Sequence, residues 1–256
     1  MKKTIKIAVA NHKGGIGKTT TALSLASNLQ KRGYKVLFVD TDAQRNSTYV
    51  YRAQIENVAT LADILYSATP VKNIVQHTDL GDIIAGDSQL QSADTTVKPG
   101  PLMYTHLKNA IEPCEKEYDF IIFDTPPRTG VVLGNVLFYT EYIIIPITCD
   151  SFGVQGVLDF YDTISEYKTV NRDLSVLGLL NIKYKGRETL TKDVEDHVQP
   201  DIAEKIGTKI FKTKIRESVK CREAQTMRVF LDDYAPACTT ARDYYDFTEE
   251  VLEEVL

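Results

Sequence analysis

The sequence lacks the features that would indicate a membrane, secreted or metal-cluster protein. No apolar run reaches the roughly 18 residues that a membrane-spanning helix needs, and residues 1–10 contain no long apolar segment typical of a signal peptide. The four cysteines have no CxxC pairing and no matching histidine spacing: Cys114, Cys149, Cys221 and Cys238. This spacing favours the interpretation that the cysteines are structural thiols in a reducing cytoplasm, and not metal ligands or disulfide partners.

Low-complexity tracts, internal repeats and linkers are absent as well, and 43% of the 256 residues are hydrophobic. We therefore expect one globular domain over residues 1–256. The net charge of −5 by itself argues against nucleic-acid binding, but the charges are unevenly distributed along the chain. Residues 205–222 carry seven Lys or Arg and one acid, whereas residues 223–256 carry two Arg and nine acids. This order along the chain predicts a polarised surface.

The most informative segment is residues 11–20, NHKGGIGKTT. It follows an apolar run at 5–10 and opens a helical pattern at 19–32, which predicts a strand, a glycine-rich loop and a helix N-terminus. Such a loop directs backbone N–H groups and the positive helix end at an anion, typically phosphate. The generic P-loop pattern has glycine where this chain has His12, and the loop offers a second lysine, Lys13.

Apolar runs that predict strands alternate with helical patterns along the chain. We expect strands at 5–10, 36–39, 82–85, 120–123, 142–147, 176–182, 209–215 and 229–231. We expect helices at 19–32, 61–66, 102–116, 131–140, 154–169, 190–206, 217–226 and 238–255. Continuous apolar strands between helices predict an α/β fold, a single doubly wound, mostly parallel sheet with helices on both faces. Ligands of such sheets bind at the carboxyl ends of the strands.

Polar residues at these strand ends are suited to Mg²⁺ and phosphate. Thr19 is placed to ligate Mg²⁺ and Lys18 to neutralise phosphate oxygens, although Thr19 could instead cap the helix. Asp124 closes an apolar strand, as in a Walker B arrangement that holds a metal-bound water, and could otherwise cap the next helix. Asp40 and Asp42 follow the second strand, where Asp42 could also be an exposed turn carboxylate.

Residues 13–20, KGGIGKTT, resemble the deviant Walker A motif of the ParA/MinD superfamily of P-loop ATPases. The resemblance implies ATP and Mg²⁺ as cofactors and a nucleotide-dependent homodimer, in which Lys13 reaches the partner's nucleotide. The nucleotide-binding residues that it implies are Lys13, Gly14, Gly15, Ile16, Gly17, Lys18, Thr19 and Thr20. Asn181 matches a position that contacts adenine in relatives, but a buried turn asparagine is nearly as good an interpretation.

Residues 40–46, DTDAQRN, resemble the superfamily's switch I motif Asp-x-Asp-Pro-Gln-Gly-Asn, and Asp124-Thr-Pro-Pro is similar to its switch II opening. These matches imply that Asp42 positions the attacking water, that Lys13 and Asp42 are catalytic, and that the metal lies near Thr19, Asp40, Asp42 and Asp124. Two residues depart from the motif. Ala43 replaces proline and is expected to loosen a turn, and Arg45 replaces glycine and adds a cation.

Other segments favour the DNA-partition branch of the superfamily. Residues 128–140 lack the cysteine of the iron–sulfur branch, and the acidic end TEEVLEEVL differs from the basic helix of the membrane branch. Residues 184–190 and 211–220 resemble DNA-contacting regions, with Lys212 and Lys214 expected on one side of a strand. The implied contacts to non-specific DNA are Arg187, Lys212, Lys214, Arg216 and Lys220. An ordinary solvated charged face is the alternative.

The resemblance thus implies a DNA-partition ATPase with weak intrinsic hydrolysis, cytoplasmic and associated with the nucleoid. Its ATP-sandwich dimer would bind DNA and leave it when a ParB-like adaptor stimulates hydrolysis. The P-loop begins so early that no N-terminal helix-turn-helix domain is expected. Two alternatives stay open, an ATP-driven positioning or regulatory protein that docks on a protein scaffold, and a metabolic enzyme that phosphorylates a carboxylate.

Overall fold

The computed structural model describes residues 3–67, 73–100, 102–185, 194 and 198–256. Its strands are β1 (Ile5–Val9), β2 (Val36–Asp40), β3 (Gln76–Thr78), β4 (Gly81–Ile84), β5 (Phe120–Asp124), β6 (Tyr142–Ile147), β7 (Ser175–Tyr184) and β8 (Ile215–Arg216). They form one sheet in the order β3-β4-β2-β5-β1-β6-β7-β8. Neighbouring strands are parallel except β3 and β4. The predicted fold class is confirmed.

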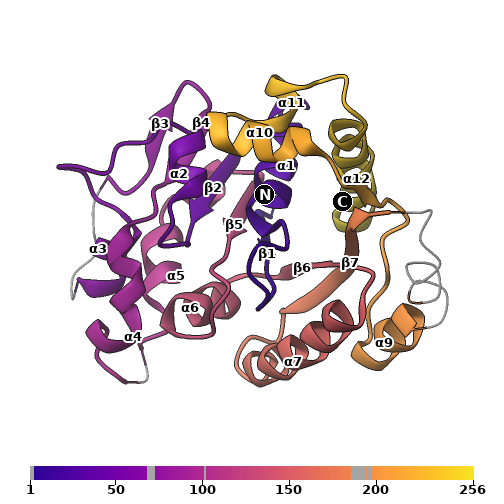
Figure 1. Cartoon of the computed structure of the whole chain (residues 1–256). Coiled ribbons are helices and arrows are strands. Elements are labelled where there is room, and N and C mark those ends of the chain that lie inside the picture. The colour runs from indigo at the N-terminus through magenta and orange to yellow at the C-terminus, as the bar shows by residue number, and fades with distance from the viewer. Residues whose placement is uncertain (1–2, 68–72, 101, 186–193, 195–197) are drawn as a thin grey trace.

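Helices cover both faces of this sheet (Figure 1). The helices are α1 (Lys18–Lys31), α2 (Asn46–Val50), α3 (Leu61–Tyr66), α4 (Ala93–Thr96), α5 (His106–Ile111), α6 (Val131–Tyr139), α7 (Ser151–Lys168), α9 (Gln199–Ile206), α10 (Val219–Met227), α11 (Leu231–Tyr234) and α12 (Thr239–Val255). Short 3₁₀ turns lie at Ser88–Ser92 and Glu115–Glu117. One face carries α1, α10, α11 and α12, and the other carries α3 to α7 and α9. Among the described residues, no helix combines the length and apolarity needed to cross a bilayer.

The core explains the continuous apolar runs of the central strands. Successive side chains of a strand point to opposite faces, and here both faces are covered. In β5, Phe120 and Ile122 pack on the side of α1 and α12, whereas Ile121 and Phe123 pack against α3, α5 and α6. All four side chains are fully buried. The sheet is therefore rigid where its carboxyl ends hold the polar residues described below.

Three expected elements differ from the structure. The helix expected at 102–116 is only His106–Ile111, and Pro113, which has no N–H to donate, lies two residues beyond its end. The strand expected at 229–231 is wrong, since Phe230 instead caps α11. Elements α2 and β3 were not anticipated. Most of residues 190–198, the first part of an expected helix, lie outside the described residues, and α9 supplies its last turns.

The strand expected at 209–215 is also largely wrong. Only Ile215–Arg216 forms β8, and a single bridge joins Leu179 to Ile210. The N–H groups of Lys212 and Thr213 donate instead to the carboxylate of Glu250, at 2.8 and 3.0 Å. A side chain of α12 thus replaces the strand partner, and the expected alternation of Lys212 and Lys214 along a strand does not occur.

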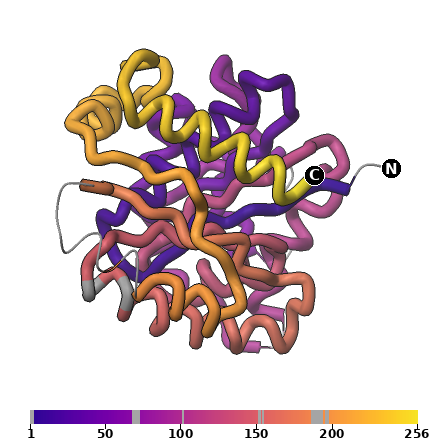
Figure 2. Tube along the Cα trace, turned by 90° about the vertical axis from the view of Figure 1, so that its right-hand side faces the viewer, coloured from indigo at the N-terminus to yellow at the C-terminus, as the bar shows by residue number. Residues whose placement is uncertain are grey.

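The basic segment and the acidic tail, expected to form a polarised surface, contact each other in the structure. The acidic helix α12 crosses the basic segment that leads into β8 (Figure 2), and ion pairs join the two. Lys209 pairs with Glu254, and Arg216 pairs with Asp243. Opposite charges that are separated along the chain are therefore partly neutralised in space.

Candidate nucleotide and metal site

The glycine-rich loop between β1 and α1 has the geometry of a phosphate cradle. Gly15 and Gly17 adopt left-handed backbone angles, with φ of 66° and 90°, a region that side chains rarely tolerate. Gly17 is the residue before α1, and a Cβ there would lie 3.1 Å from Cδ1 of Ile182. The backbone conformation of these glycines and the nearby Ile182 of β7 thus restrict the loop. The loop and the N-terminus of α1 line the cavity described below.

Lys18 lies beneath this loop and is only 6% exposed. Its Nζ donates to the carbonyl oxygen of Lys13 at 3.1 Å. Burial lowers the pKa of Lys18, while the nearby carboxylates of Asp124 and Asp42 act in the opposite direction. A buried ammonium at a helix N-terminus is suited to an anion with several oxygens, such as a polyphosphate.

Two carboxylates meet at the ends of neighbouring strands. Asp40 of β2 and Asp124 of β5 are register partners and are fully buried. Asp40 accepts hydrogen bonds from the hydroxyl and N–H of Thr48, at 2.7 and 2.8 Å. Asp124 accepts from Ser47 at 2.7 Å and from Thr19 at 3.3 Å. Three residues predicted to lie near a metal, Thr19, Asp40 and Asp124, are therefore brought together.

The electrostatics of this pair fit a divalent cation. Burial raises the pKa of Asp124, and the adjacent charge of Asp40 raises it further. Burial also raises the pKa of Asp40, although hydrogen bonds from Thr48 partly offset the rise. Two buried carboxylates with a threonine hydroxyl are hard oxygen donors, and Mg²⁺ commonly uses one or two carboxylates together with substrate phosphates. Bound Mg²⁺ would supply positive charge to the phosphate oxygens.

Asp42 lies at the edge of the site and not within the buried pair. Its carboxylate is half-buried, lines the cavity in front of the loop and accepts from the N–H of Gln44 at 2.9 Å. The N–H of Arg45 donates to the carbonyl of Asp42 at 3.0 Å. Two hydrogen bonds thus close the turn that Ala43 was expected to loosen. A partly exposed carboxylate facing the cavity could orient a water molecule.

The side chain of Lys13 extends from the loop toward Thr148 and Asp150, just before α7. Its Nζ lies 3.7 Å from Oδ1 of Asp150 and 3.4 Å from the hydroxyl of Thr148. Both side chains of the Lys13–Asp150 pair are 40% exposed. Surface pairs of this kind contribute about 0–1 kcal/mol, so the lysine can exchange Asp150 for another anion at little cost.

A cavity of about 540 Å³ lies in front of the loop. It is bounded by residues of the P-loop, switch I, β7 and α10, among them Gly14, Gly15, Gly17, Lys18, Thr19, Thr20, Asp42, Lys183, Arg216 and Gln225. Gln225 donates to the hydroxyl of Thr20 at 2.7 Å, which fixes α10 to the start of α1. The cavity is large enough for a nucleotide and opens directly onto the predicted phosphate-binding residues.

Asn181 is placed differently from the other predicted ligands. It is fully buried, and its amide exchanges two hydrogen bonds with Gln199 of α9, at 2.9 and 2.7 Å. The thiol of Cys149 also donates to Asn181. The residues that line the cavity do not include Asn181. In this arrangement Asn181 fits the alternative interpretation, a buried asparagine that joins β7 to α9.

Arg45 has a clear structural role despite replacing glycine. It precedes α2 in the left-handed conformation, with φ of 58° and ψ of 29°. This is the geometry that glycine tolerates best, so the chain keeps the backbone of the motif with an unfavourable residue. The guanidinium lies 5.3 Å from the ring centre of Tyr49, and that of Arg228, directly after α10, lies 4.1 Å from the same ring. Switch I is thereby held against the end of α10.

We expect the usual order of alanine and glycine to be reversed at this position. Arg45→Ala and Arg45→Gly both remove the guanidinium, so they differ only in the left-handed backbone. Glycine should be the more stable variant by about 1 kcal/mol, because alanine carries the steric cost of positive φ. Urea unfolding of the two variants measures the difference. Alanine equal to or more stable than glycine would contradict the backbone assignment.

The residues predicted to contact DNA are only partly brought together. Arg216 donates from its Nε and Nη2 to both carboxylate oxygens of Asp243, at 3.0 and 2.5 Å. Lys220 pairs with Glu223 of the same helix at 2.7 Å, and Lys214 lies 4.8 Å from the ring centre of Tyr184. The side chain of Lys212 is exposed. Arg187 lies outside the described residues.

Several residues of the site were missed from the sequence. Ser47 and Thr48 hold Asp124 and Asp40, and Lys183 donates to the carbonyl of Gly15 at 2.8 Å. Ser47 and Thr48 directly follow the switch I motif in the sequence, and this position could have indicated that their hydroxyls bond the carboxylates of the site. Lys183 had no such signal, because only the end of β7 brings it to the P-loop.

Fold and site together define a P-loop nucleotide-binding protein of the parallel α/β class. A family model described as an AAA domain matches residues 4–176. The sporulation initiation inhibitor protein Soj of Bacillus subtilis is 32% identical over 96% of the chain and 97% of that protein. The chromosome-partitioning ATPase Soj of Thermus thermophilus is 30% identical over 99% and 97%. The chain therefore belongs to the ParA/Soj family of chromosome- and plasmid-partitioning P-loop ATPases.

Solved structures agree with this fold. Cobyrinic acid a,c-diamide synthase from Mycobacterium smegmatis, with bound ADP and magnesium, has a TM-score of 0.80 at 26% identity, covering 98% of this chain and 94% of that chain. Apo McdA of Cyanothece has a TM-score of 0.83 at 21% identity, covering 97% and 99%. A partition protein from Borrelia burgdorferi bound to AMPPNP has a TM-score of 0.79 at 23% identity, covering 99% and 100%. The last two show the fold alone.

Proposed function

We propose that this partition ATPase binds ATP with Mg²⁺, closes into a face-to-face dimer and holds non-specific DNA until hydrolysis releases it. The observation that carries the proposal is the juxtaposition of Lys18, Thr19, Asp40 and Asp124 at one edge of the sheet. The partition relatives and the magnesium–ADP complex of the synthase structure support it.

Each residue has a defined task in this proposal. The P-loop N–H groups and Lys18 hold the phosphates, while Thr19, Asp40 and Asp124 would hold the Mg²⁺. Asp42 faces the cavity and orients the attacking water. Because Asp42 is anchored only by its own turn, hydrolysis of the isolated protein is expected to be slow.

The dimer follows from the position of Lys13. Its ammonium lies outside the cradle, in a weak pair with Asp150, and not over its own loop. We propose that Lys13 leaves Asp150 to contact the phosphates bound by a second copy. A dimer would also double the area that each DNA duplex contacts.

The proposed DNA contacts are Lys212, Lys214, Arg216, Lys220 and Arg187. Binding would depend on phosphate charge, without base readout. A ParB-like adaptor that stimulates hydrolysis would end the contact, and the protein would act in the cytoplasm on the nucleoid. The ion pair of Arg216 with Asp243 makes a simple charge reversal at Arg216 a poor test, since it would leave two carboxylates facing each other.

A better test compares Arg216→Gln with Asp243→Asn. If Arg216 contacts DNA phosphate, Arg216→Gln should weaken ATP-dependent retention on plain duplex DNA by about 10-fold, and the log–log salt slope should become shallower by about 0.9. Asp243→Asn releases the guanidinium and should retain or strengthen binding. Retention is measured with ATP, with ADP and without nucleotide.

Equal weakening in both variants would show that the Arg216–Asp243 pair matters only for the fold. Lys116→Gln is the matched control, because Lys116 is exposed at the amino ends of the strands, away from the proposed surface. If the wild type binds ATP but is retained on DNA in no nucleotide state, DNA binding is refuted. The alternative, a positioning ATPase that docks on a protein scaffold, would then be favoured.

A further inference from the structure

An unusual lysine stands at the mouth of the phosphate cradle. Lys183 belongs to β7 and adopts a left-handed backbone with φ of 51°. The pairing of β7 with β8 shifts between Ile182 and Tyr184, so Lys183 is the bulged residue. For a lysine this backbone conformation is strained, and such outliers concentrate at functional sites.

The bulge turns the Lys183 side chain toward the P-loop. Its Nζ donates to the carbonyl oxygen of Gly15 at 2.8 Å, and the residue lines the cavity beside Gly14, Lys18 and Thr19. The neighbouring Ile182 contacts the loop at Gly17. Two consecutive residues of β7 therefore touch the loop that is expected to hold phosphate, one through an apolar contact and one through a charge.

The hydrogen bond to Gly15 leaves N–H donors of the Lys183 ammonium available for a ligand. A lysine has three N–H donors, and one of them is used by Gly15. The remaining donors lie at an exposed rim, where Lys183 is not paired with any carboxylate among the described residues. Lys18 lies deeper and is nearly buried, so the two lysines approach the cavity from different depths.

We propose that Lys183 is a further phosphate-binding residue of this site, which contacts the polyphosphate of the nucleotide while anchoring the loop through Gly15. The inference rests on the proposed function, because it requires that the cavity binds a nucleoside di- or triphosphate. It adds a cation from β7 to Lys18 of the same loop and to Lys13, which the proposed dimer takes from the second copy. The strained bulge is then the means by which β7 delivers a charge to the cradle.

The test is the affinity of the full chain for ATP and ADP, measured with Mg²⁺ by calorimetry at low and at physiological salt. Lys183→Met should weaken both nucleotides by about 10-fold, with a smaller effect at high salt because the group is exposed. Lys183→Arg should retain most of the affinity. Lys185→Met, two residues further on and half-exposed beside Glu217, should bind like the wild type.

Lys183→Gly distinguishes the effect of the lysine charge from the effect of the left-handed backbone at this position. Glycine accepts the left-handed conformation without cost, so this variant should keep the bulge and the stability of the apo protein, yet lose nucleotide affinity as Lys183→Met does. Wild-type affinity in both Lys183→Met and Lys183→Gly would overturn the inference while leaving the proposed function intact. A wild type that binds neither nucleotide would overturn both.

Discussion

Asp124→Asn is expected to abolish Mg²⁺-dependent ATP hydrolysis and, at the same time, to stabilise the protein without nucleotide. Loss of a metal-holding carboxylate should lower the hydrolysis rate by at least about 100-fold. The gain in stability follows from the buried pair, since ionised Asp124 is desolvated beside Asp40. Asparagine removes that charge and can still bond Ser47 and Thr19.

The stability effect has a defined pH dependence. A carboxyl whose pKa is raised in the folded state contributes stability below its unfolded pKa, and that contribution is lost as pH rises through the folded pKa. Unfolding in urea should therefore show Asp124→Asn more stable than wild type at about pH 8.5, and the difference should shrink as pH falls toward about 4. Magnesium should stabilise the wild type at high pH and leave the variant unchanged.

Asp42→Asn is the matched control for this experiment. Its carboxylate is half-buried and bonds only its own turn, and its charge is a minor cause of the raised pKa of Asp124, so the substitution should lower hydrolysis with a smaller pH-dependent gain in stability. An Asp124→Asn variant that is less stable than wild type at high pH would contradict the electrostatic account of the pair. Hydrolysis at the wild-type rate would contradict its assignment to the metal.

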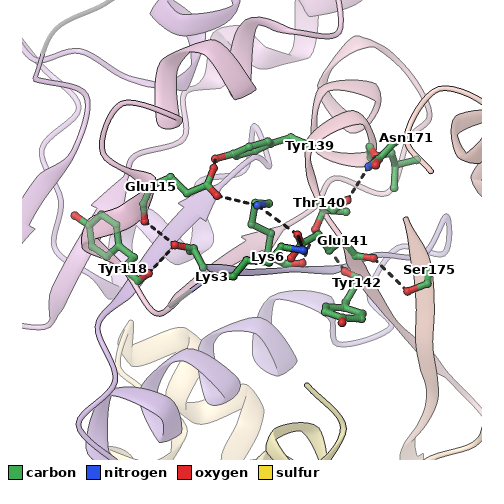
Figure 3. A network of polar contacts seen from close by, with 12 residues as sticks. Lys3, Lys6, Glu115, Tyr118, Tyr139, Thr140, Glu141, Tyr142, Asn171 and Ser175 are labelled. Carbon is green, nitrogen blue, oxygen red and sulfur yellow. Dashed lines mark hydrogen bonds and ion pairs between the residues drawn. The ribbon is translucent and has the colours of Figure 1, made fainter. Parts of the chain in front are cut away.

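Lys6→Met is expected to produce the largest loss of stability, about 3 kcal/mol, because it leaves the largely buried carboxylate of Glu115 without its cation and removes one of the two lysines that contact Glu141. Lys6 lies in β1 with its side chain 9% exposed, at the end of the sheet opposite the P-loop. Its Nζ lies 2.9 Å from Glu115 and 3.6 Å from Glu141 (Figure 3). Tyr139 also donates to Glu115, at 2.5 Å.

The pKa of Glu115 supports the expectation that loss of Lys6 is strongly destabilising. Burial acts to raise the pKa of Glu115, but hydrogen bonds from Tyr139 and Lys6 outweigh it and hold the pKa below its usual range. A carboxyl with a lowered folded pKa contributes stability above its unfolded pKa, and the contribution is lost as pH falls through the folded value. The difference between Lys6→Met and wild type should therefore shrink below about pH 4.

Lys3→Met provides a matched comparison, because Lys3 contacts the same carboxylate, Glu141, at 2.7 Å but is 73% exposed. It should cost no more than about 1 kcal/mol. Urea unfolding measures both variants, and nucleotide affinity should stay near the wild-type value in the folded fraction. A Lys6→Met variant as stable as Lys3→Met would show that the buried cation is not required.

The amino-acid pattern was sufficient to predict the parallel sheet and the parts of the site that are contiguous in the chain. Strands buried on both faces are apolar throughout, so the patterns at 36–39 and 120–123 predicted β2 and β5 together with the carboxylates that follow them. The loop before α1 was equally readable, because its strand, glycines and helix start are contiguous. The sequence did not predict α2 and β3, because the five residues of α2 form fewer than two helical turns and the three residues of β3 are all polar.

Packing between elements sets which charges that are distant in the chain come into contact. The chain order suggested a basic segment and an acidic tail, but packing of α12 against the segment before β8 pairs Arg216 with Asp243. The same kind of long-range contact buries Asn181 against Gln199 and brings Lys183 to Gly15. Pattern along a chain reports which face of an element is apolar. Coulomb energies and desolvation depend on distances between elements, and these exist only once the sheet and its covering helices are assembled.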